Sequence, residues 1–372
     1  MKYSRCSFKR CIGASRKLPG LNDRKLININ QYASTYDHST PGLWRGPMCL
    51  LKLNRLYLLL LLIFLASCNA PEKGASFEGV AMTIPYKVLI PQKLNSEQKK
   101  SIQEEIHAIF HKIDAIYNNW NKDSEISRLN NLPANKRVPI SQELFFFLQK
   151  VYELVYQTDS LFDPTISPLY SLWKRNLLAK ELPSPEEIER VSLCCGWDKI
   201  HHEKGLFWKE HENASFDFCG CVKGYCVDLL TERLQALGFE DGLVEWGGEI
   251  RAFGNHSTSR PWRVGISPIS FSHALQPISL ENEAIATSGD TWSFWEVDNT
   301  TYSHIIHPHT KAPMRVSERS IASVTVVAKS CMQADAFATA LMLFQTPEEA
   351  TLFGSELKKR FPEIQFWIQT RS

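Results

Sequence analysis

A run of small residues near the middle of the chain carries two acids and one lysine. The run extends from Asp217 to Asp228, contains two glycines and has Lys223 near its centre. Small side chains let a ligand approach the backbone closely. Apolar residues continue from the run at helical spacing, which predicts that a helix begins here; they are Val227, Leu230, Leu234 and Leu237.

The start of such a helix has free backbone N–H groups and the positive end of the helix dipole, and both favour an anion. Lys223 would then face a phosphate. The alternative is a buried turn of small residues in which Lys223 points to water. The spacing alone slightly favours this alternative, because glycine-rich turns before helices are common.

A second pair of polar residues lies in a helix predicted from Met332 to Phe344. Asp335 and Thr339 are four residues apart and therefore share one helix face. A carboxylate and a hydroxyl are hard oxygen ligands, suited to Mg²⁺ together with water or phosphate oxygens. The alternative is that the pair caps the helix start. Such pairs are frequent, so without further context capping is the better interpretation.

Two single residues could also contact a ligand. His304 lies in a polar elbow at 302–308 and could contact a phosphate or transfer a proton. A structural histidine beside two isoleucines is the more common case. Trp120 could stack on a flat ring or simply cover the core. A second polar elbow is expected at 286–290.

The elements that must position these residues alternate irregularly between helix and strand, which predicts an α+β fold. Helices are expected to start at Ser96, Ser141, Ser184, Met332 and Thr346. The segment 161–169 is interpreted as a loop held by two prolines. Strands are expected at 80–90, on both sides of Gly247-Gly248 as a hairpin, and at 262–266, 323–327 and 364–368.

The N-terminal part has the pattern of an export signal. Lys52 and Arg55 precede an apolar run that ends in Leu-Ala-Ser-Cys at Cys68, and this run is too short for an ordinary transmembrane helix. The ending resembles the bacterial lipoprotein signal, in which the cysteine is lipidated. An uncleaved signal anchor is the alternative.

Because such a signal begins a chain, we expect translation to start at Met48. Residues 1–47 would then be untranslated or disordered, and residues 48–67 would be the signal peptide. Residues 68–78 would form a polar tether. Residues 79–372 would form the folded domain, which at this size could consist of two lobes.

Composition excludes some classes of protein. The 42 basic residues nearly balance the 40 acidic ones, so no nucleic-acid partner is expected, and 44% hydrophobic residues suffice for a globular core. Beyond Cys68 no cysteines form a CxxC pair, which argues against a zinc site and a thioredoxin-like site. Three of them, Cys219, Cys221 and Cys226, are expected to serve as small apolar residues.

Taken in order, these segments resemble the ApbE family of FAD:protein FMN transferases. The resemblance extends from about Met82 to Leu343. Its ordered blocks are 120–130, Phe162-Asp163-Pro164-Thr165 to Pro168-Leu169, Asp217 to Asp228, Gly247-Gly248, Thr287-Ser288-Gly289, Ser303-His304-Ile305-Ile306 and 334–339.

The resemblance implies an ApbE-like fold of mixed or antiparallel sheets with flanking helices. It implies FAD binding by Met82, Trp120, Leu161, Phe162, Asp163, Asp217, Lys223 and His304. It also implies Mg²⁺ held by Asp335, Thr339 and the backbone carbonyl of Gly220. In the implied reaction Mg²⁺ and the catalytic Lys223 neutralise the pyrophosphate, and a threonine hydroxyl attacks the flavin-side phosphorus of FAD. AMP leaves, and His304 or a nearby carboxylate removes the proton.

One block departs from the family pattern. Ile306-His307-Pro308-His309-Thr310-Lys311 stands where the family has Ile-Asp-Pro-Arg-Thr-Gly. An acid, an arginine and a glycine are replaced, so we expect the acceptor end or the adenosine end of the site to differ.

The expected protein is therefore a lipid-anchored flavin transferase on the periplasmic side of the bacterial inner membrane. Its acceptors, by the same resemblance, are subunits of a membrane redox complex such as a Na⁺-pumping NADH:quinone reductase or an Rnf-type complex. Two alternatives are a Mg²⁺-dependent FAD pyrophosphatase and a non-catalytic FAD-binding lipoprotein. The Asp335 and Thr339 pair argues against pure binding, because storage needs no metal on the pyrophosphate.

Overall fold

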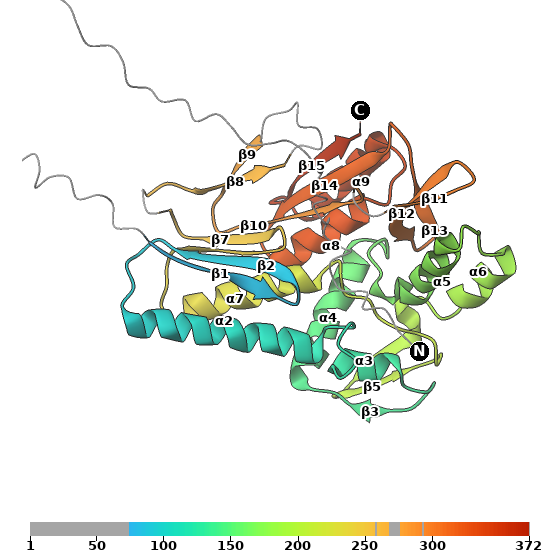
Figure 1. The fold of residues 1–372 in the computed structure, drawn as a ribbon, viewed down its shortest axis with the longest axis horizontal. Helices are drawn as coiled ribbons and strands as arrows, with labels where there is room; N and C mark the ends of the chain where they lie inside the picture. Colours follow the sequence, from blue (N-terminus) through green and yellow to red (C-terminus); the bar gives the residue numbers. More distant parts are fainter. Residues whose placement is uncertain (1–73, 257–258, 268–275, 292–293, 372) are drawn as a thin grey trace, which may run out of the picture. The chain divides into compact units, whose positions relative to one another are not determined.

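A sheet of seven antiparallel strands forms the centre of the fold, in the order β1-β2-β6-β7-β10-β14-β15 (Figure 1). The computed structural model describes residues 74–256, 259–267, 276–291 and 294–371. The strands of this sheet are β1 (Ala75–Ala81), β2 (Ile84–Ile90), β6 (Gly242–Trp246), β7 (Glu249–Phe253), β10 (Ala284–Gly289), β14 (Ile321–Ala328) and β15 (Gln365–Thr370).

Both faces of the central sheet are covered, which explains why β14 is almost continuously apolar. Val324 and Val326 join the main core on one face, and Val327 joins a smaller core on the other. That smaller core is closed by the hairpin of β8 (Trp262–Ile266) and β9 (Gln276–Leu280).

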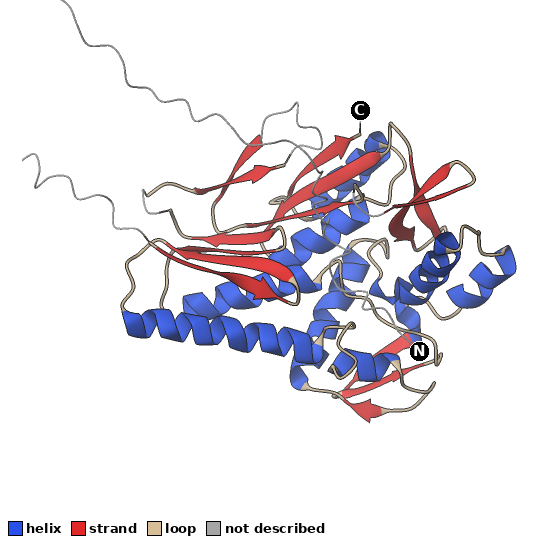
Figure 2. Ribbon diagram, in the orientation of Figure 1, coloured by secondary structure: helices blue, strands red, loops and turns tan. Residues whose placement is uncertain are grey.

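Four of the helices that contribute to the main core pack against one another, and Figure 2 shows the longest of them running below the central sheet. They are α2 (Ser96–Ile116), α4 (Gln142–Gln157), α7 (Val222–Ala236) and α8 (Cys331–Leu341). The helix α7 packs between α2 and α8, and α8 packs on β10 and β14. The two segments singled out for chemistry, at the start of α7 and within α8, therefore lie on neighbouring helices.

Smaller elements complete the described part of the chain. A three-stranded sheet of β11 (Phe294–Val297), β12 (Thr300–His307) and β13 (Ala312–Val316) packs against α5 (Ser167–Leu178). The remaining elements are β3 (Val138–Pro139), β4 (Ile200–Glu203), β5 (Leu206–Lys209), α3 (Glu125–Asn130), α6 (Pro185–Ser192), α9 (Pro347–Arg360) and the 3₁₀ helices at Pro164–Ile166 and Trp197–Lys199.

The α+β prediction is confirmed, and so are most of the predicted helix starts. Ser141, Ser184 and Thr346 each cap their helix with the side chain, and Ser184 and Thr346 do so in a capping box. The cap of α2 is Asn95 rather than Ser96, because the Asn95 side chain accepts the Gln98 N–H.

Five local predictions are wrong, at least in part. The strand expected at 80–90 is a hairpin that turns at Met82 and Thr83, with φ of 48° and 70°. Because β1 starts at Ala75, the last residues of the expected tether belong to the sheet. The loop expected at 161–169 contains a 3₁₀ helix and the start of α5. The elbows expected at 286–290 and 302–308 are mostly strand, in β10 and β12.

The described residues all fall in one compact unit. Within that part of the chain, no helix combines the length and the apolar character needed to cross a membrane. The predicted signal peptide and the predicted lipidation site, Cys68, lie outside the described residues.

Candidate functional site

A cavity lies where the start of α7, the middle of α8 and the strands β10 and β12 come together. It gathers nearly all the residues expected to bind FAD or Mg²⁺. They are Trp120, Leu161, Phe162, Asp163, Asp217, Gly220, Lys223, His304, Asp335 and Thr339. Segments more than 200 positions apart in the sequence thus line the same cavity.

Met82 is the exception, because it is not among the residues that line the cavity. It lies in the β1–β2 turn and packs, half-buried, against the main core. Ile84, two residues further on in β2, lines the cavity instead.

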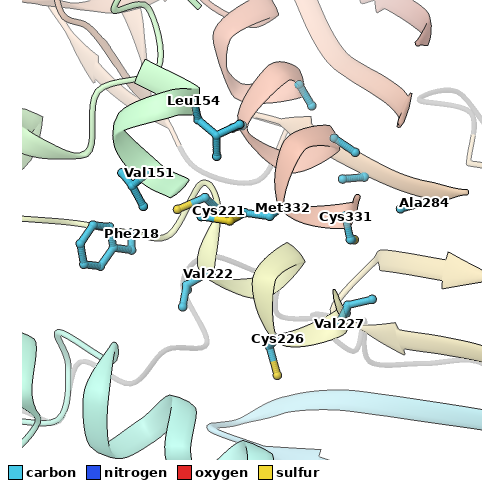
Figure 3. Close-up of a cluster of buried hydrophobic side chains, with 14 of the residues drawn as sticks. Val151, Leu154, Phe218, Cys221, Val222, Cys226, Val227, Ala284, Cys331 and Met332 are labelled. Atoms are coloured by element: carbon cyan, nitrogen blue, oxygen red, sulfur yellow. The ribbon is translucent and has the colours of Figure 1, made fainter. Parts of the chain in front are cut away.

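The loop before α7 is held by alternate burial of its side chains. Phe216 and Phe218 are buried and stack with their ring centroids 5.0 Å apart. Asp217, between them, faces the cavity, and its carboxylate accepts the Cys219 N–H at 2.9 Å. Figure 3 shows Phe218 and Cys221 among the buried apolar side chains, so Cys221 is a small apolar residue, as predicted.

Close contact between α7 and α8 requires a glycine at position 224. A Cβ added there would lie 2.4 Å from the Cys331 carbonyl oxygen, which belongs to the backbone of α8. The Gly224 N–H donates to Asp335 Oδ2 at 3.3 Å. Since Lys223 is the residue before Gly224, this contact brings the lysine and the α8 carboxylate to the same wall.

Capping does not explain Asp335 and Thr339, because other side chains cap α8. Ser330 Oγ accepts the Gln333 N–H at 3.2 Å. The carboxylate of Asp228 accepts the N–H groups of Cys331 and Met332 at 2.8 and 2.9 Å. The capping interpretation of Asp335 and Thr339 is therefore wrong.

The three expected metal ligands are close together and suit Mg²⁺ chemically. A Cβ added to Gly220 would lie 3.0 Å from Thr339 Oγ1, so this backbone runs next to the hydroxyl. Thr339 Oγ1 also lies 3.1 Å from Ser288 Oγ. Asp335 adds a carboxylate that is only 3% exposed. A carboxylate, a hydroxyl and a carbonyl are all hard oxygen donors. No group of three or more His, Cys, Asp or Glu residues suited to a metal occurs in the described ranges.

Lys223 does not point to water, so that alternative is also wrong. Its ammonium group pairs with Oε1 of Glu249, the first residue of β7, and its side chain is 19% exposed. Burial alone would lower the pKa of Lys223, but the carboxylates of Glu249 and Asp335 outweigh it and raise the pKa above the ordinary value. Lys223 is therefore a cation held between two acids.

Burial raises the pKa values of both acids beside Lys223, Glu249 and Asp335. Burial raises the pKa of Glu249 to about 7, against the opposing effect of Lys223. Burial likewise raises the pKa of Asp335, again opposed by Lys223. Two buried carboxylates around one lysine favour a further cation, since each charge would otherwise be costly to desolvate.

Sequence reasoning missed Glu249 as a site residue. The predicted hairpin around Gly247-Gly248 does form, with φ of 66° and 104° at the two glycines. It places Glu249 at the cavity, where the side chain is 1% exposed. An acid directly after a glycine turn and before an apolar strand is the signal that could have found it.

The rim of the cavity is aromatic. Trp120 is 45% exposed, so it does not simply cover the core. Lys174 Nζ of α5 lies 5.7 Å from the Trp120 ring centroid and 5.3 Å from that of Tyr170. Both rings line the cavity, and an exposed ring at a rim suits stacking on a flat ligand.

His304 and Asp163 are each held by an irregular stretch of backbone. The register of β12 against β13 shifts between Tyr302 and Ile306, and such bulges re-aim side chains. Asp163 caps its 3₁₀ helix by accepting from the backbone N–H and the hydroxyl of Thr165 at 2.9 and 2.7 Å. Burial raises the pKa of Asp163.

The segment that departs from the family pattern, Ile306 to Lys311, forms the turn between β12 and β13. His307 Nδ1 accepts from the backbone N–H groups of His309 and Thr310 at 3.1 and 3.4 Å. Lys311 has φ of 59°, and its N–H donates to the His307 carbonyl at 2.8 Å. The neutral imidazole of His307 thus accepts the hydrogen bonds that an aspartate carboxylate would accept at this position. Pro308, the next residue, lines the cavity. Burial lowers the pKa of His307, and His309 lowers it further.

The chain is similar in sequence and in structure to proteins of the ApbE family. The sequence model of the ApbE family matches residues 81–360. The FAD:protein FMN transferase of Chlamydia pneumoniae is 38% identical over 300 residues, which cover 80% of this chain and 93% of that protein. The apo structure of the Pseudomonas stutzeri flavinyl transferase ApbE superposes with a TM-score of 0.71 at 29% identity, covering 81% of this chain and 92% of that one. The flavin transferase ApbE from Vibrio cholerae superposes with a TM-score of 0.67 at 29% identity, covering 81% and 94%.

Proposed function

The chain belongs to the ApbE family, and we propose that it is an FAD:protein FMN transferase that esterifies FMN to a threonine hydroxyl of an acceptor protein. The observation that carries this proposal is one cavity lined by Lys223, Asp335, Thr339 and the Gly220 backbone and also by the aromatic rings of Trp120 and Tyr170. The cation and hard oxygen donors suit the pyrophosphate of FAD, and the aromatic side chains suit its flat rings.

Asp335, Thr339 and the Gly220 carbonyl would hold Mg²⁺. Bound there, the ion would neutralise charge on the pyrophosphate and so help the phosphorus accept a nucleophile.

The protein's own residues supply positioning and charge. Lys223 faces the pyrophosphate and stabilises the negative charge that develops as the bond between the two phosphates breaks. Trp120 packs on a ring of FAD and holds the molecule in line. The threonine oxygen forms a bond to the flavin-side phosphorus, AMP leaves with the other phosphate, and His304 accepts the hydroxyl proton.

We further propose that the acceptor is a subunit of a membrane redox complex of the Na⁺-pumping NADH:quinone reductase or Rnf type. The signal-like segment that ends at Cys68 supports a lipid anchor on the periplasmic side of the inner membrane. That anchor would hold the enzyme beside acceptors in the same membrane.

The test combines two readouts in one reaction. Purified protein is incubated with FAD, Mg²⁺ and a fragment of a candidate acceptor, and in-gel flavin fluorescence and AMP release are measured together. Flavin fixed to the acceptor, lost with Asp335→Ala and with an acceptor whose target threonine is valine, supports the transferase. AMP and free FMN without a labelled acceptor would instead indicate the pyrophosphatase. FAD bound but unchanged would indicate a carrier and contradict both enzymes.

A further inference from the structure

Glu249, which pairs with Lys223, is a charged residue of the cavity wall that is not among the expected FAD and Mg²⁺ ligands. Glu249 lines the cavity with a side chain that is 1% exposed. Its Oε1 contacts the Lys223 ammonium, whereas its Oε2 is buried and has no hydrogen-bond partner among the described residues. The pair joins α7 to β7, two elements that the core already packs together.

Stability alone is a poor reason for this pair. Burying two charges costs desolvation free energy that their attraction barely offsets, and apolar residues of similar size often serve as well. A buried carboxylate oxygen without a partner adds a further cost. Charges kept at such cost on a cavity wall indicate a role in the chemistry of that cavity.

The geometry restricts what Glu249 can act on. Its partner, Lys223, is the one lysine among the described residues that line the cavity. The second carboxylate near that lysine, Asp335, is already an expected metal ligand. A lysine side chain is flexible and can adopt many rotamers, so its charge acts at a fixed point only if a neighbour holds it. Glu249 is rigidly placed by the β6–β7 hairpin and can provide that restraint.

We propose that Glu249 is a positioning residue, which holds the Lys223 ammonium at the point where the pyrophosphate bond breaks. The inference rests on the proposed function and extends it by one residue. Glu249 acts through Lys223 and contacts neither the phosphorus nor the leaving group. Removing its charge leaves a lysine that still attracts FAD but no longer stabilises the transition state well.

Glu249→Gln is the informative change, because it keeps the shape of the side chain and removes the charge. We expect kcat to fall about 10- to 100-fold, the effect of misplacing a catalytic group by roughly 1 Å. The dissociation constant of FAD, measured by flavin fluorescence without acceptor, should change by less than about threefold, since Lys223 remains charged. Lys223→Met should weaken FAD binding itself.

The double variant separates positioning from a structural role. If Glu249 acts through Lys223, adding Glu249→Gln to Lys223→Met causes no further loss of kcat per bound FAD. Glu249→Asp should recover part of the activity. Glu105→Gln is the matched control, because Glu105 also pairs with a cation of α7, Arg233, but does not line the cavity; its kcat should equal that of the wild type.

Several results would overturn the inference while leaving the transferase intact. One is an independent further loss in the double variant, and another is a Glu249→Gln protein with full activity. A third is a Glu249→Gln protein with normal kcat at saturating Mg²⁺ but a raised Mg²⁺ requirement, which would make Glu249 a metal ligand. A wild-type protein that transfers no FMN would instead contradict the proposed function.

Discussion

Substitution of Asp228 should strongly lower the stability of the fold, although Asp228 does not line the candidate site. Its carboxylate accepts the first two N–H groups of α8, from Cys331 and Met332, and also accepts from Arg251 at 2.7 Å. The residue is 5% exposed. Asp228→Ala would leave two buried N–H groups and one cation without this acceptor.

The size of the effect follows from these contacts. Hydrogen bonds to a charged group contribute about 1.5–3 kcal/mol each, and breaking a buried ion pair costs about 3–5 kcal/mol. The contributions overlap, so we expect Asp228→Ala to lower the free energy of unfolding by about 4 kcal/mol. With an m-value of about 3 kcal/mol/M, the midpoint in urea would fall by about 1.3 M.

Urea unfolding followed by tryptophan fluorescence measures this change, and two further variants calibrate it. Asp228→Asn can keep one of the two cap bonds and should lose about half as much stability. Glu232→Ala removes a 62% exposed carboxylate that lies 3.7 Å from Arg251, so it should cost about 0.5 kcal/mol or less. A loss below about 1 kcal/mol for Asp228→Ala would refute the view that this carboxylate holds α8 in place.

Three further predictions follow from other contacts in the described part of the chain. Gly224→Ala forces its Cβ against the Cys331 carbonyl, so it should cost about 1–3 kcal/mol and raise the Mg²⁺ concentration needed for half-maximal activity; an unchanged melting temperature would contradict this. Lys209→Met removes the donor of three hydrogen bonds to backbone carbonyls at 2.6–2.7 Å, so urea unfolding should show a loss of about 3 kcal/mol. Burial lowers the pKa of His307 below 6.5, so the unfolded chain takes up this proton first and stability should fall as the pH drops below 6.5. Thermal melts at pH 7.5 and 5.5 should then show a smaller drop for His307→Asn than for the wild type, and equal drops would refute the role of the imidazole.

Much of the site could be predicted because its residues occur in short motifs. Lys223 follows a run of small residues, and Asp335 and Thr339 share a helix face by their spacing alone. What spacing could not decide was the role of each group. Whether Lys223 faces water depends on β7, a strand contributed from further along the chain, and whether Asp335 caps its helix depends on Asp228.

The failures have physical causes that can be named. The turn at Met82 and Thr83 has two positive φ values without the glycine or asparagine that usually marks such a turn. The start of α5 was predicted as a loop because it contains Pro168. Proline is in fact well tolerated in the first turn of a helix. Glu249 was missed because its partner lies 26 residues earlier in the chain, a separation at which periodicity carries no information.

We propose that this cavity binds the FAD whose FMN is transferred to a protein hydroxyl, and that Asp335 holds Mg²⁺ there. The most direct measurement is the intact mass of a purified acceptor fragment after incubation with FAD and the wild-type protein. The expected result is a gain equal to one esterified FMN, which is lost when Mg²⁺ is chelated, restored when it is returned, and absent with Asp335→Asn. An acceptor labelled equally well by the Asp335→Asn protein, or in the presence of the chelator, would contradict the claim.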